Sequence, residues 1–380
     1  MRITLISRSW PPFERSGVSL SAFSHARILL KQGHEVSIIG AMQGLDAISL
    51  SLTSRVQIPA SGSGALYSPV QLDKNRLKQV LSENKPDLVI VEAWQTALTD
   101  SAIEIASELH IPILMISHGI SLHPYENSLS QFLRSIAWLP YRIFKLPRLM
   151  KKLSAITTLD DQSTSNRFAD RDLAKGMGVP LAVLKNFPAH EIKLNVPRVE
   201  RKIQILVIGY FSSVKNQLAA IQLLSRLENH ISCRFIGDRQ GRYFEACQKL
   251  VSQLKLQNRI SFLQDDECNI AQEIAESLLV FSPSITEALP MTLIEAMACG
   301  TPFVATSVGA VSSFKGGILA NTADEQLKAL QILIDIPELW ETYSVAGEKQ
   351  YQADFTEAAI SIQLTNAIDL AAQGYSNIKG

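Results

Sequence analysis

Residues 281–306 read FSPSITEALPMTLIEAMACGTPFVAT and decide the fold class of this chain. An apolar run is followed by an irregular turn that holds Glu287, and then by a helix predicted over residues 291–298. Pro290 can open that helix, because proline is well tolerated in a first helical turn. A glycine and a proline end the helix before a strand predicted over residues 303–306. The stretch is therefore an α/β crossover with polar groups at the carboxyl end of its first strand, where open parallel sheets bind ligands.

Glu287 and Glu295 of this stretch are separated by seven residues. Taken alone, they fit ordinary acids: Glu295 solvated on its helix, and Glu287 in a loop near the positive end of that helix. The apolar neighbours of Glu295 favour a buried helix instead, and a buried glutamate needs a partner or a ligand. Those neighbours are Met291, Leu293, Ile294, Met297 and Ala298.

The chain has 380 residues, too many for one core and suited to two domains of ordinary size. Its formal net charge is zero, so nothing global argues for a nucleic-acid partner. The four cysteines have no CxxC spacing and fit reduced thiols of a cytoplasmic protein better than disulfides or a zinc site. No apolar run reaches the roughly 18 residues needed to span a membrane, and the amino terminus predicts a first strand and not a signal peptide.

Apolar strand patterns alternate with helical patterns along both halves, which predicts parallel α/β architecture. In the first half we expect strands at residues 3–7, 35–39, 88–92, 113–117 and 155–158, with helices at 20–31, 72–82 and 102–109. In the second half we expect strands at 203–208, 233–236, 260–263, 279–282 and 303–306, with helices at 216–227, 243–256 and 291–298. Residues 187–202, FPAHEIKLNVPRVERK, lack periodicity and predict an interdomain linker, and a last helix is predicted over residues 356–372.

Lys215 lies in VIGYFSSVKN, residues 207–216, which runs from a strand through a small-residue loop into a helix. A lysine at such a helix start can neutralise phosphate charge, and the free backbone N–H groups there are further donors. Taken alone, such a lysine is more often a solvated surface residue.

Two strand ends in the first half also carry candidate residues. Gly17 joins the first strand to the first helix, where a missing side chain permits close approach of a ligand. His118 follows the strand predicted at residues 113–117, and it is either a ligand-binding or a hydrogen-bonded structural residue.

The spacing E-x7-E followed by AMACGTP closely resembles the signature of retaining glycosyltransferase family 4, the group 1 glycosyltransferases. The resemblance is strongest over residues 203–309. It implies an α/β fold of the GT-B type, in which two Rossmann-like, doubly wound domains face a cleft. Residues 1–190 would bind the acceptor, residues 191–355 would bind a nucleotide sugar, and residues 356–380 would form a helix that crosses back to the first domain.

The same resemblance implies transfer of a hexose from a nucleotide diphosphate sugar to a saccharide or lipid-linked saccharide, with retention and with neither cofactor nor metal. In it, Glu295 holds the ribose hydroxyls, Glu287 lies beside the transferred sugar, and His118 contacts that sugar or the acceptor. Lys215 holds the diphosphate. The catalytic set is thus Glu287, His118 and Lys215, and the donor-binding set is Gly17, Gly209, Lys215, Glu287, Met291, Thr292 and Glu295.

Two positions depart from the family pattern. Tyr210 stands where the family commonly has arginine, so one cationic arm of the diphosphate clamp is missing or replaced. Ser16 stands where the family often has the first of two glycines. These departures leave open a non-catalytic binding partner with the same fold. A sugar-nucleotide epimerase is the other alternative, against which the E-x7-E spacing argues.

Residues 131–152, QFLRSIAWLPYRIFKLPRLMKK, contain six basic residues and no acid, with aromatic residues between them. This composition suits peripheral contact with anionic headgroups on the inner face of the plasma membrane, which would favour a lipid-linked acceptor. An ordinary helix pair is an equal alternative, because Pro140 and Pro147 break any long amphipathic helix.

Asp265, Asp266 and Glu267 could suggest a divalent metal site, because clustered carboxylates bind magnesium or manganese. They follow a predicted strand and no other residue with ligand spacing accompanies them, so a solvated loop is the better interpretation.

Overall fold

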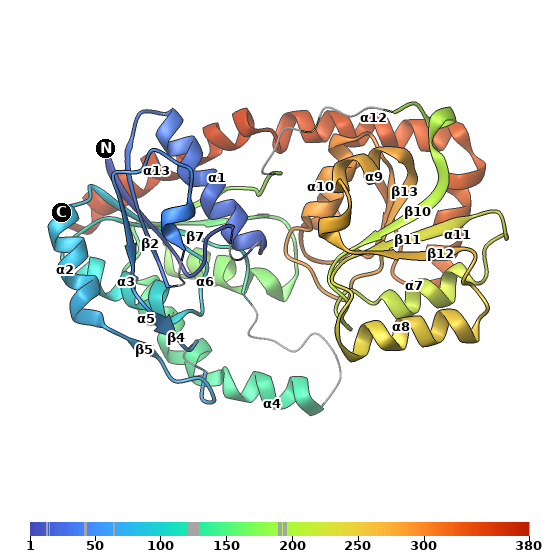
Figure 1. Cartoon of the computed structure of the whole chain (residues 1–380). Helices are drawn as coiled ribbons and strands as arrows, with labels where there is room; N and C mark the ends of the chain where they lie inside the picture. The colour runs from blue at the N-terminus through green and yellow to red at the C-terminus, as the bar shows by residue number, and fades with distance from the viewer. Residues whose placement is uncertain are drawn as a thin grey trace. The chain divides into compact units, whose positions relative to one another are not determined.

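The structure is a computed structural model that describes residues 1–12, 14, 16–41, 44–63, 65–120, 129–188, 192 and 196–379. The chain forms two compact units, the first from Met1–Ala189 with Glu357–Gly380 and the second from His190–Thr356. Each unit is built on a parallel sheet flanked by helices, so the predicted α/β class is confirmed (Figure 1).

The first unit contains a seven-stranded parallel sheet in the order β3-β2-β1-β6-β7-β8-β9. Its strands are β1 (Arg2–Ser7), β2 (Glu35–Gly40), β3 (Ser54–Gln57), β6 (Leu88–Glu92), β7 (Ile113–Ile116), β8 (Ala155–Thr158) and β9 (Leu181–Val183). A small antiparallel ribbon, β4 (Ala60–Ser61) with β5 (Gln71–Leu72), follows β3 along the chain. The strand order reverses between β1 and β6, so their carboxyl ends form the switch point at which such sheets bind ligands.

Alternate residues of these strands fill a core on each face of the sheet. Ile3 and Leu5 lie in one core, with α1 (Gly17–Lys31) and α13 (Glu357–Lys379), while Ile6 lies in the other. The second core is covered by α2 (Lys74–Asn84), α3 (Ala97–Glu108), α5 (Leu146–Met150) and α6 (Ala169–Met177). The last helix, α13, packs on β7, β8 and β9 and lies beside α1 (Figure 1).

The second unit contains a six-stranded parallel sheet in the order β12-β11-β10-β13-β14-β15. Its strands are β10 (Lys202–Ile208), β11 (Ser232–Ile236), β12 (Ile260–Leu263), β13 (Ser277–Ser282), β14 (Phe303–Ala305) and β15 (Gly317–Leu319). Its helices are α7 (Gln217–Leu224), α8 (Gly241–Gln253), α9 (Ile270–Glu276), α10 (Met291–Ala298), α11 (Ala323–Asp335) and α12 (Pro337–Asp354). Here the strand order reverses between β10 and β13, and α7 pairs with α8 while α9 pairs with α10 (Figure 1).

Every predicted strand and helix is present, with ends that differ by up to seven residues. The pattern missed the short strands β3, β4, β5, β9 and β15 and the helices α6, α9, α11 and α12. The predicted linker, residues 187–202, reaches β10, whose first residue is Lys202; its residues 189–191 and 193–195 lie outside the described part of the chain. Residues 131–152 fold as the end of α4 (Leu129–Ala137), a π-helical turn (Tyr141–Lys145) and α5, so no single long helix forms.

Candidate functional site

The switch point of the second unit brings Lys215 and Glu287 together. Gly209 follows β10 with a φ of +145°, and a Cβ there would lie 3.2 Å from Cε of Lys215. Glu287 lies in the connection between β13 and α10. Nζ of Lys215 is 2.6 Å from Oε1 of Glu287, and the side chains are only 19% and 14% exposed. Two residues predicted for one site, 72 positions apart in sequence, therefore form a half-buried ion pair.

Tyr210, in the position of the expected arginine, contacts the same lysine. Nζ of Lys215 lies 5.7 Å from the centre of the Tyr210 ring, within the range of a cation–π interaction. The ring itself is 54% exposed. Tyr210 therefore adds an aromatic face beside the lysine, and not a second positive charge.

Glu295 lies half-buried on α10, between the buried residues Ile294 and Ala296. Burial raises the pKa of Glu295 to about 7, because a low-dielectric surrounding disfavours the charged carboxylate. Within the described ranges, no hydrogen bond or ion pair to its carboxyl group is formed. This carboxyl can therefore accept hydrogen bonds from a polar ligand.

The connection from β13 to α10 is held by close backbone packing. Gly309 has a φ of +58°, and a Cβ there would lie 2.2 Å from the carbonyl oxygen of Glu287. The N–H of Ala310 donates to the carbonyl of Ala288 at 2.8 Å. Met291 and Thr292 begin α10, whose N-cap is Pro290 with no side-chain hydrogen bond. The expected proline in the first turn is thus one position earlier, and the amides of Met291 and Thr292 stand at the helix start.

The switch point of the first unit holds a buried cluster of His25, Glu92 and His118. Nδ1 of His25 and Nε2 of His118 each lie 2.7 Å from a different carboxylate oxygen of Glu92, the last residue of β6. Burial by itself raises the pKa of Glu92, but the charge and hydrogen bonds of the two histidines outweigh it and hold the pKa at about 2. Because an ionised carboxylate has no hydrogen to donate, both of these ring nitrogens carry one.

The other ring nitrogens of this cluster are buried. Nδ1 of His118 and Nε2 of His25 have no hydrogen-bond partner within the part of the chain that the structure describes. His118 was predicted from its position after a strand, whereas His25 and Glu92 were missed. The sequence feature that could have predicted Glu92 is an acid at the end of the apolar strand 88–92, because a buried carboxylate needs a hydrogen-bond or ion-pair partner.

Gly17 is the first residue of α1, at the same edge of the first sheet as this cluster. A Cβ at Gly17 would meet no atom of the described residues within 4 Å, so packing does not require a glycine there. Ser16, the departure from the family pattern, is the N-cap of α1: its hydroxyl accepts a hydrogen bond from the N–H of Ser19 at 3.3 Å.

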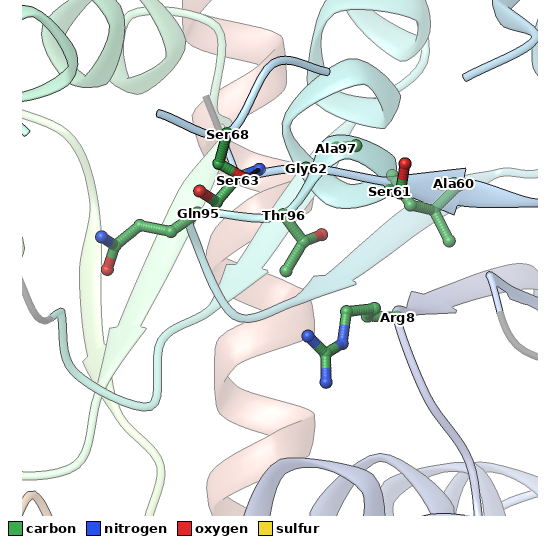
Figure 2. A pocket seen from close by; sticks show the side chains of 10 residues that line it. Arg8, Ala60, Ser61, Gly62, Ser63, Ser68, Gln95, Thr96 and Ala97 are labelled. Atoms are coloured by element: carbon green, nitrogen blue, oxygen red, sulfur yellow. Dashed lines mark hydrogen bonds between the residues drawn. The ribbon is translucent and has the colours of Figure 1, made fainter. Parts of the chain in front are cut away.

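A pocket of about 410 Å³ opens at the carboxyl ends of β1 and β6. Figure 2 shows Arg8 at the end of β1, Thr96 at the start of α3, and Ser63 beside Ser68. Arg8 also forms a 3.1 Å ion pair with Glu14. Hydroxyl, amide and guanidinium groups thus line a concave site together with the apolar side chains of Ala60, Ala97 and Leu98, and none of these residues was predicted from the sequence.

The acidic run at Asp265–Glu267 forms a short 3-10 helix with a capping box, and Glu267 pairs with Arg239. Over the described ranges, no group of three or more His, Cys, Asp or Glu side chains is arranged to hold a metal ion. Over the same ranges, no helix has both the length and the apolar character needed to cross a bilayer.

The chain has two doubly wound units, and each has candidate residues at its switch point. Solved structures with the same arrangement of strands and helices identify the fold. HepE of Anabaena in complex with UDP is similar with a TM-score of 0.71 and 18% identity, covering 97% of this chain and 100% of that one. Sucrose-phosphate synthase from Thermosynechococcus elongatus is similar with a TM-score of 0.71 and 17% identity, covering 97% and 98%. The GT-B fold is thereby confirmed.

Sequence comparisons indicate which class of protein has this fold here. Residues 190–350 match the model of the family described as glycosyl transferases group 1. An uncharacterized glycosyltransferase of Haemophilus influenzae is 25% identical over 342 residues, covering 85% of this chain and 88% of that protein. The N-acetyl-alpha-D-glucosaminyl L-malate synthase of Bacillus anthracis is 29% identical over 107 residues, 28% of each chain. Together these matches support a glycosyltransferase, and the similarity to group 1 lies in residues 190–350.

Proposed function

We propose that the protein is a retaining, family 4 glycosyltransferase that moves a hexose from a nucleotide diphosphate sugar to a saccharide or lipid-linked saccharide in glycan biosynthesis. The observation that carries this proposal is the half-buried ion pair of Lys215 with Glu287 at the switch point of the second unit, 2.6 Å long. A buried ion pair at a ligand-binding edge is costly to maintain for stability alone, which favours a functional role.

In this proposal the second unit binds the donor. Lys215 and the first amides of α10, at Met291 and Thr292, stabilise the negative charge that develops on the departing diphosphate, with Gly209 permitting close approach. The carboxyl group of Glu295, raised in pKa and unpaired within the described residues, accepts hydrogen bonds from the ribose hydroxyls. Glu287 holds the sugar beside the reacting carbon.

HepE was solved with UDP and with UDP-glucose, so uridine nucleotides are the first donors to test. The leaving phosphate accepts the proton of the acceptor hydroxyl, so the reaction needs no separate base. Neither a cofactor nor a metal ion is part of the proposal.

The first unit binds the acceptor in this proposal. Nδ1 of His118 is buried and has no hydrogen-bond partner within the described residues, so it would form a hydrogen bond with a sugar hydroxyl. The pocket between Arg8 and Thr96 offers hydroxyl and guanidinium groups to the rest of a saccharide acceptor, and Gly17 lies at the same edge of the sheet. We place the enzyme in the cytoplasm, with peripheral contact to the inner face of the plasma membrane through residues 131–152.

Lys215→Ala tests the donor site. We expect UDP and UDP-glucose to raise the melting temperature of the wild-type protein, and Lys215→Ala to weaken UDP binding about tenfold or more, the usual effect of losing a hydrogen bond to a charged group. Glu287→Ala should abolish sugar transfer while retaining UDP binding. The matched control is Lys249→Ala, at an exposed lysine of α8.

The outcomes separate the alternatives. Binding of UDP-glucose without transfer to any acceptor or hydrolysis would indicate a non-catalytic binding partner, and conversion of the free sugar nucleotide to an isomer would indicate an epimerase. The site assignment is wrong if Lys215→Ala and Glu287→Ala both behave like the wild-type protein.

A further inference from the structure

The apolar face of α4 is turned toward solvent. Leu129, Phe132, Leu133 and Ile136 follow the spacing of a single helical face and are 74%, 57%, 56% and 45% exposed. A surface helix of a globular protein normally turns such a stripe toward the core. Contiguous exposed apolar residues of this kind mark a site of interaction.

A loop distant in sequence extends the same surface. Leu66 and Tyr67, between β4 and β5, are 70% and 63% exposed. The N–H of Leu66 donates to the carbonyl of Ala137, the last residue of α4, at 3.2 Å. Two segments about 70 positions apart in the chain therefore meet with their apolar side chains outside, an association that the sequence of residues 131–152 alone does not contain.

The π-helical turn after α4 adds Ile143 and Phe144, which are 50% and 73% exposed. The turn itself is anchored: Tyr141 is buried, its hydroxyl donates to Asp100 at 3.1 Å, and Nζ of Lys145 lies 2.9 Å from the same carboxylate. The exposed side chains thus stand on a fixed support. We define the α4 surface by these eight residues: Leu66, Tyr67, Leu129, Phe132, Leu133, Ile136, Ile143 and Phe144.

The charged residues within the segments that carry the α4 surface are all basic. Residues 129–152 contain six basic residues and no acid, and residues 65–70 contain no charge. Arg148 and Lys151 are exposed. A partner for this region must therefore accept apolar side chains and carry negative charge beside them, which an anionic bilayer does through its acyl chains and headgroups.

We propose that the α4 surface inserts into the interface of an anionic phospholipid bilayer, with Phe132, Phe144 and Tyr67 among the acyl chains and the exposed Arg148 and Lys151 at the headgroups. The role of this membrane contact, which is to bring the first unit to a lipid-linked acceptor, rests on the proposed function. The contact itself needs no activity and is measured without substrate.

The test is co-sedimentation of the full chain with vesicles of phosphatidylcholine alone or mixed in equal parts with phosphatidylglycerol. We expect binding to the anionic vesicles, weaker at high salt. Phe132→Ser with Phe144→Ser should weaken that binding at least about tenfold, because each loses a buried aromatic ring. The matched control is Val345→Ser with Ile362→Ser, which removes apolar groups that are 54% and 64% exposed on α12 and α13.

Charge reversal tests the electrostatic part. Arg148→Glu with Lys151→Glu should weaken binding about tenfold or more, whereas Lys249→Glu with Lys328→Glu, the same change at exposed residues of the second unit, should not. Circular dichroism should show the same fold for all variants, since every changed residue is exposed.

Three results would overturn the proposal: no binding to anionic vesicles, equal binding to both kinds of vesicle, or wild-type binding by the double phenylalanine variant. Light scattering that showed a dimer, made monomeric by Phe132→Ser with Phe144→Ser, would assign the α4 surface to a second copy of the chain instead. UDP binding, followed by thermal shift on the same variants, separates failure of the donor site from failure of the membrane surface.

Discussion

Burial gives Glu295 an acidity unlike that of a surface glutamate. It is one of the 36 acidic residues of the chain, but its place on α10 among buried apolar residues raises its pKa to about 7. A group in this state is protonated or ionised at neutral pH with similar ease. A ligand that donates hydrogen bonds to the carboxylate would therefore shift it toward the ionised form.

This pKa predicts how stability depends on pH. Because the pKa of Glu295 is raised from 4.5 to about 7 on folding, the folded protein binds more protons than the unfolded chain between these values. Stability is therefore fully present below pH 4.5 and falls as the pH rises to about 7, by about 3 kcal/mol from this residue. The Glu295→Gln variant has no carboxyl group at this position, so it does not lose this stability as the pH rises. Its free energy of unfolding relative to that of the wild-type protein should therefore increase between pH 4.5 and about 7.

The measurement is urea unfolding without ligand at the two ends of the range, followed for the second unit by the fluorescence of Trp340. The control, Glu245→Gln, changes an exposed glutamate of α8 and should show a difference that does not vary with pH. A constant difference for Glu295→Gln as well would contradict the raised pKa.

The pKa of Glu92 is also shifted by its surroundings, but downward and not upward. Its two histidines keep the carboxylate ionised although it is fully enclosed, because paired hydrogen bonds and positive charge outweigh the cost of burial. A lone His118 in a sequence does not reveal this. Only the arrangement of α1, β6 and β7 assembles the three side chains.

At the scale of elements, backbone packing positions the candidate donor residues as much as their own side chains do. The connection from β13 to α10 lies against Gly309, which begins the 3-10 turn Gly309–Ser313 after β14. The carbonyl oxygens of Glu287 and Ala288 occupy the space that any side chain at position 309 would need. The loop of Glu287 is therefore held in place by a neighbouring loop.

Gly309→Ala should displace this loop. The added Cβ would lie 2.2 Å from the carbonyl oxygen of Glu287, so the Glu287 loop must move, and we expect a loss of about 1–3 kcal/mol in stability. UDP affinity should fall as well, because the displaced loop leads directly into α10, whose first amides we propose to hold the diphosphate. Calorimetric titration with UDP and thermal unfolding measure the two effects.

The matched control is Gly33→Ala. Gly33 also has a positive φ, of +81°, but a Cβ there meets nothing within 4 Å. This variant should show only the cost of the left-handed backbone, about 1–2 kcal/mol, with unchanged UDP affinity. If the two variants bound UDP equally well, Gly309 would have no part in supporting the site.

The strands missed from the sequence share a physical cause. β9 and β15 are three residues long at the edges of their sheets, and β4 and β5 have two residues each. β3 is a polar edge strand, SRVQ, with half-buried side chains. Such strands have too few residues for an alternating pattern, and neighbouring strands decide their conformation.

At the scale of the whole molecule, the two units carry different kinds of candidate site. The match to group 1 glycosyltransferases covers residues 190–350, almost all of the second unit. The first unit carries the Glu92 cluster, the polar pocket and the α4 surface. This division fits a donor site in the second unit and acceptor functions in the first.

Hydrogen exchange should reveal that division. With UDP in excess, we expect slower amide exchange over residues 209–217 and 285–295, because a ligand that binds only the folded form suppresses local opening. Exchange over residues 60–70 and 95–98, around the pocket of the first unit, should remain unchanged. Mass spectrometry of peptic fragments with and without UDP measures both. Protection confined to the first unit would place the nucleotide there and contradict the proposed donor site.

The sequence by itself determined the α/β class, most strands and helices, the positions of Glu287, Lys215 and His118 in the connections that follow strands, and the position of Glu295 on a helix. These features are local, because hydrophobic periodicity and turn residues act over a few neighbouring positions. Only the tertiary structure decided which of these residues meet. The Lys215–Glu287 pair spans 72 positions and the His25–Glu92 pair spans 67, and both depend on the order of strands in a sheet.

Tertiary structure also decided which way the apolar residues of α4 face. The sequence of residues 131–152 fits an ordinary helix pair and an interfacial membrane segment equally, because periodicity identifies a face without saying what covers it. The burial of Tyr141 on Asp100 and the contact of Leu66 with Ala137 turn that face to solvent. The direction of a face depends on which other elements the helix packs against, and those contacts come from residues far away in the chain.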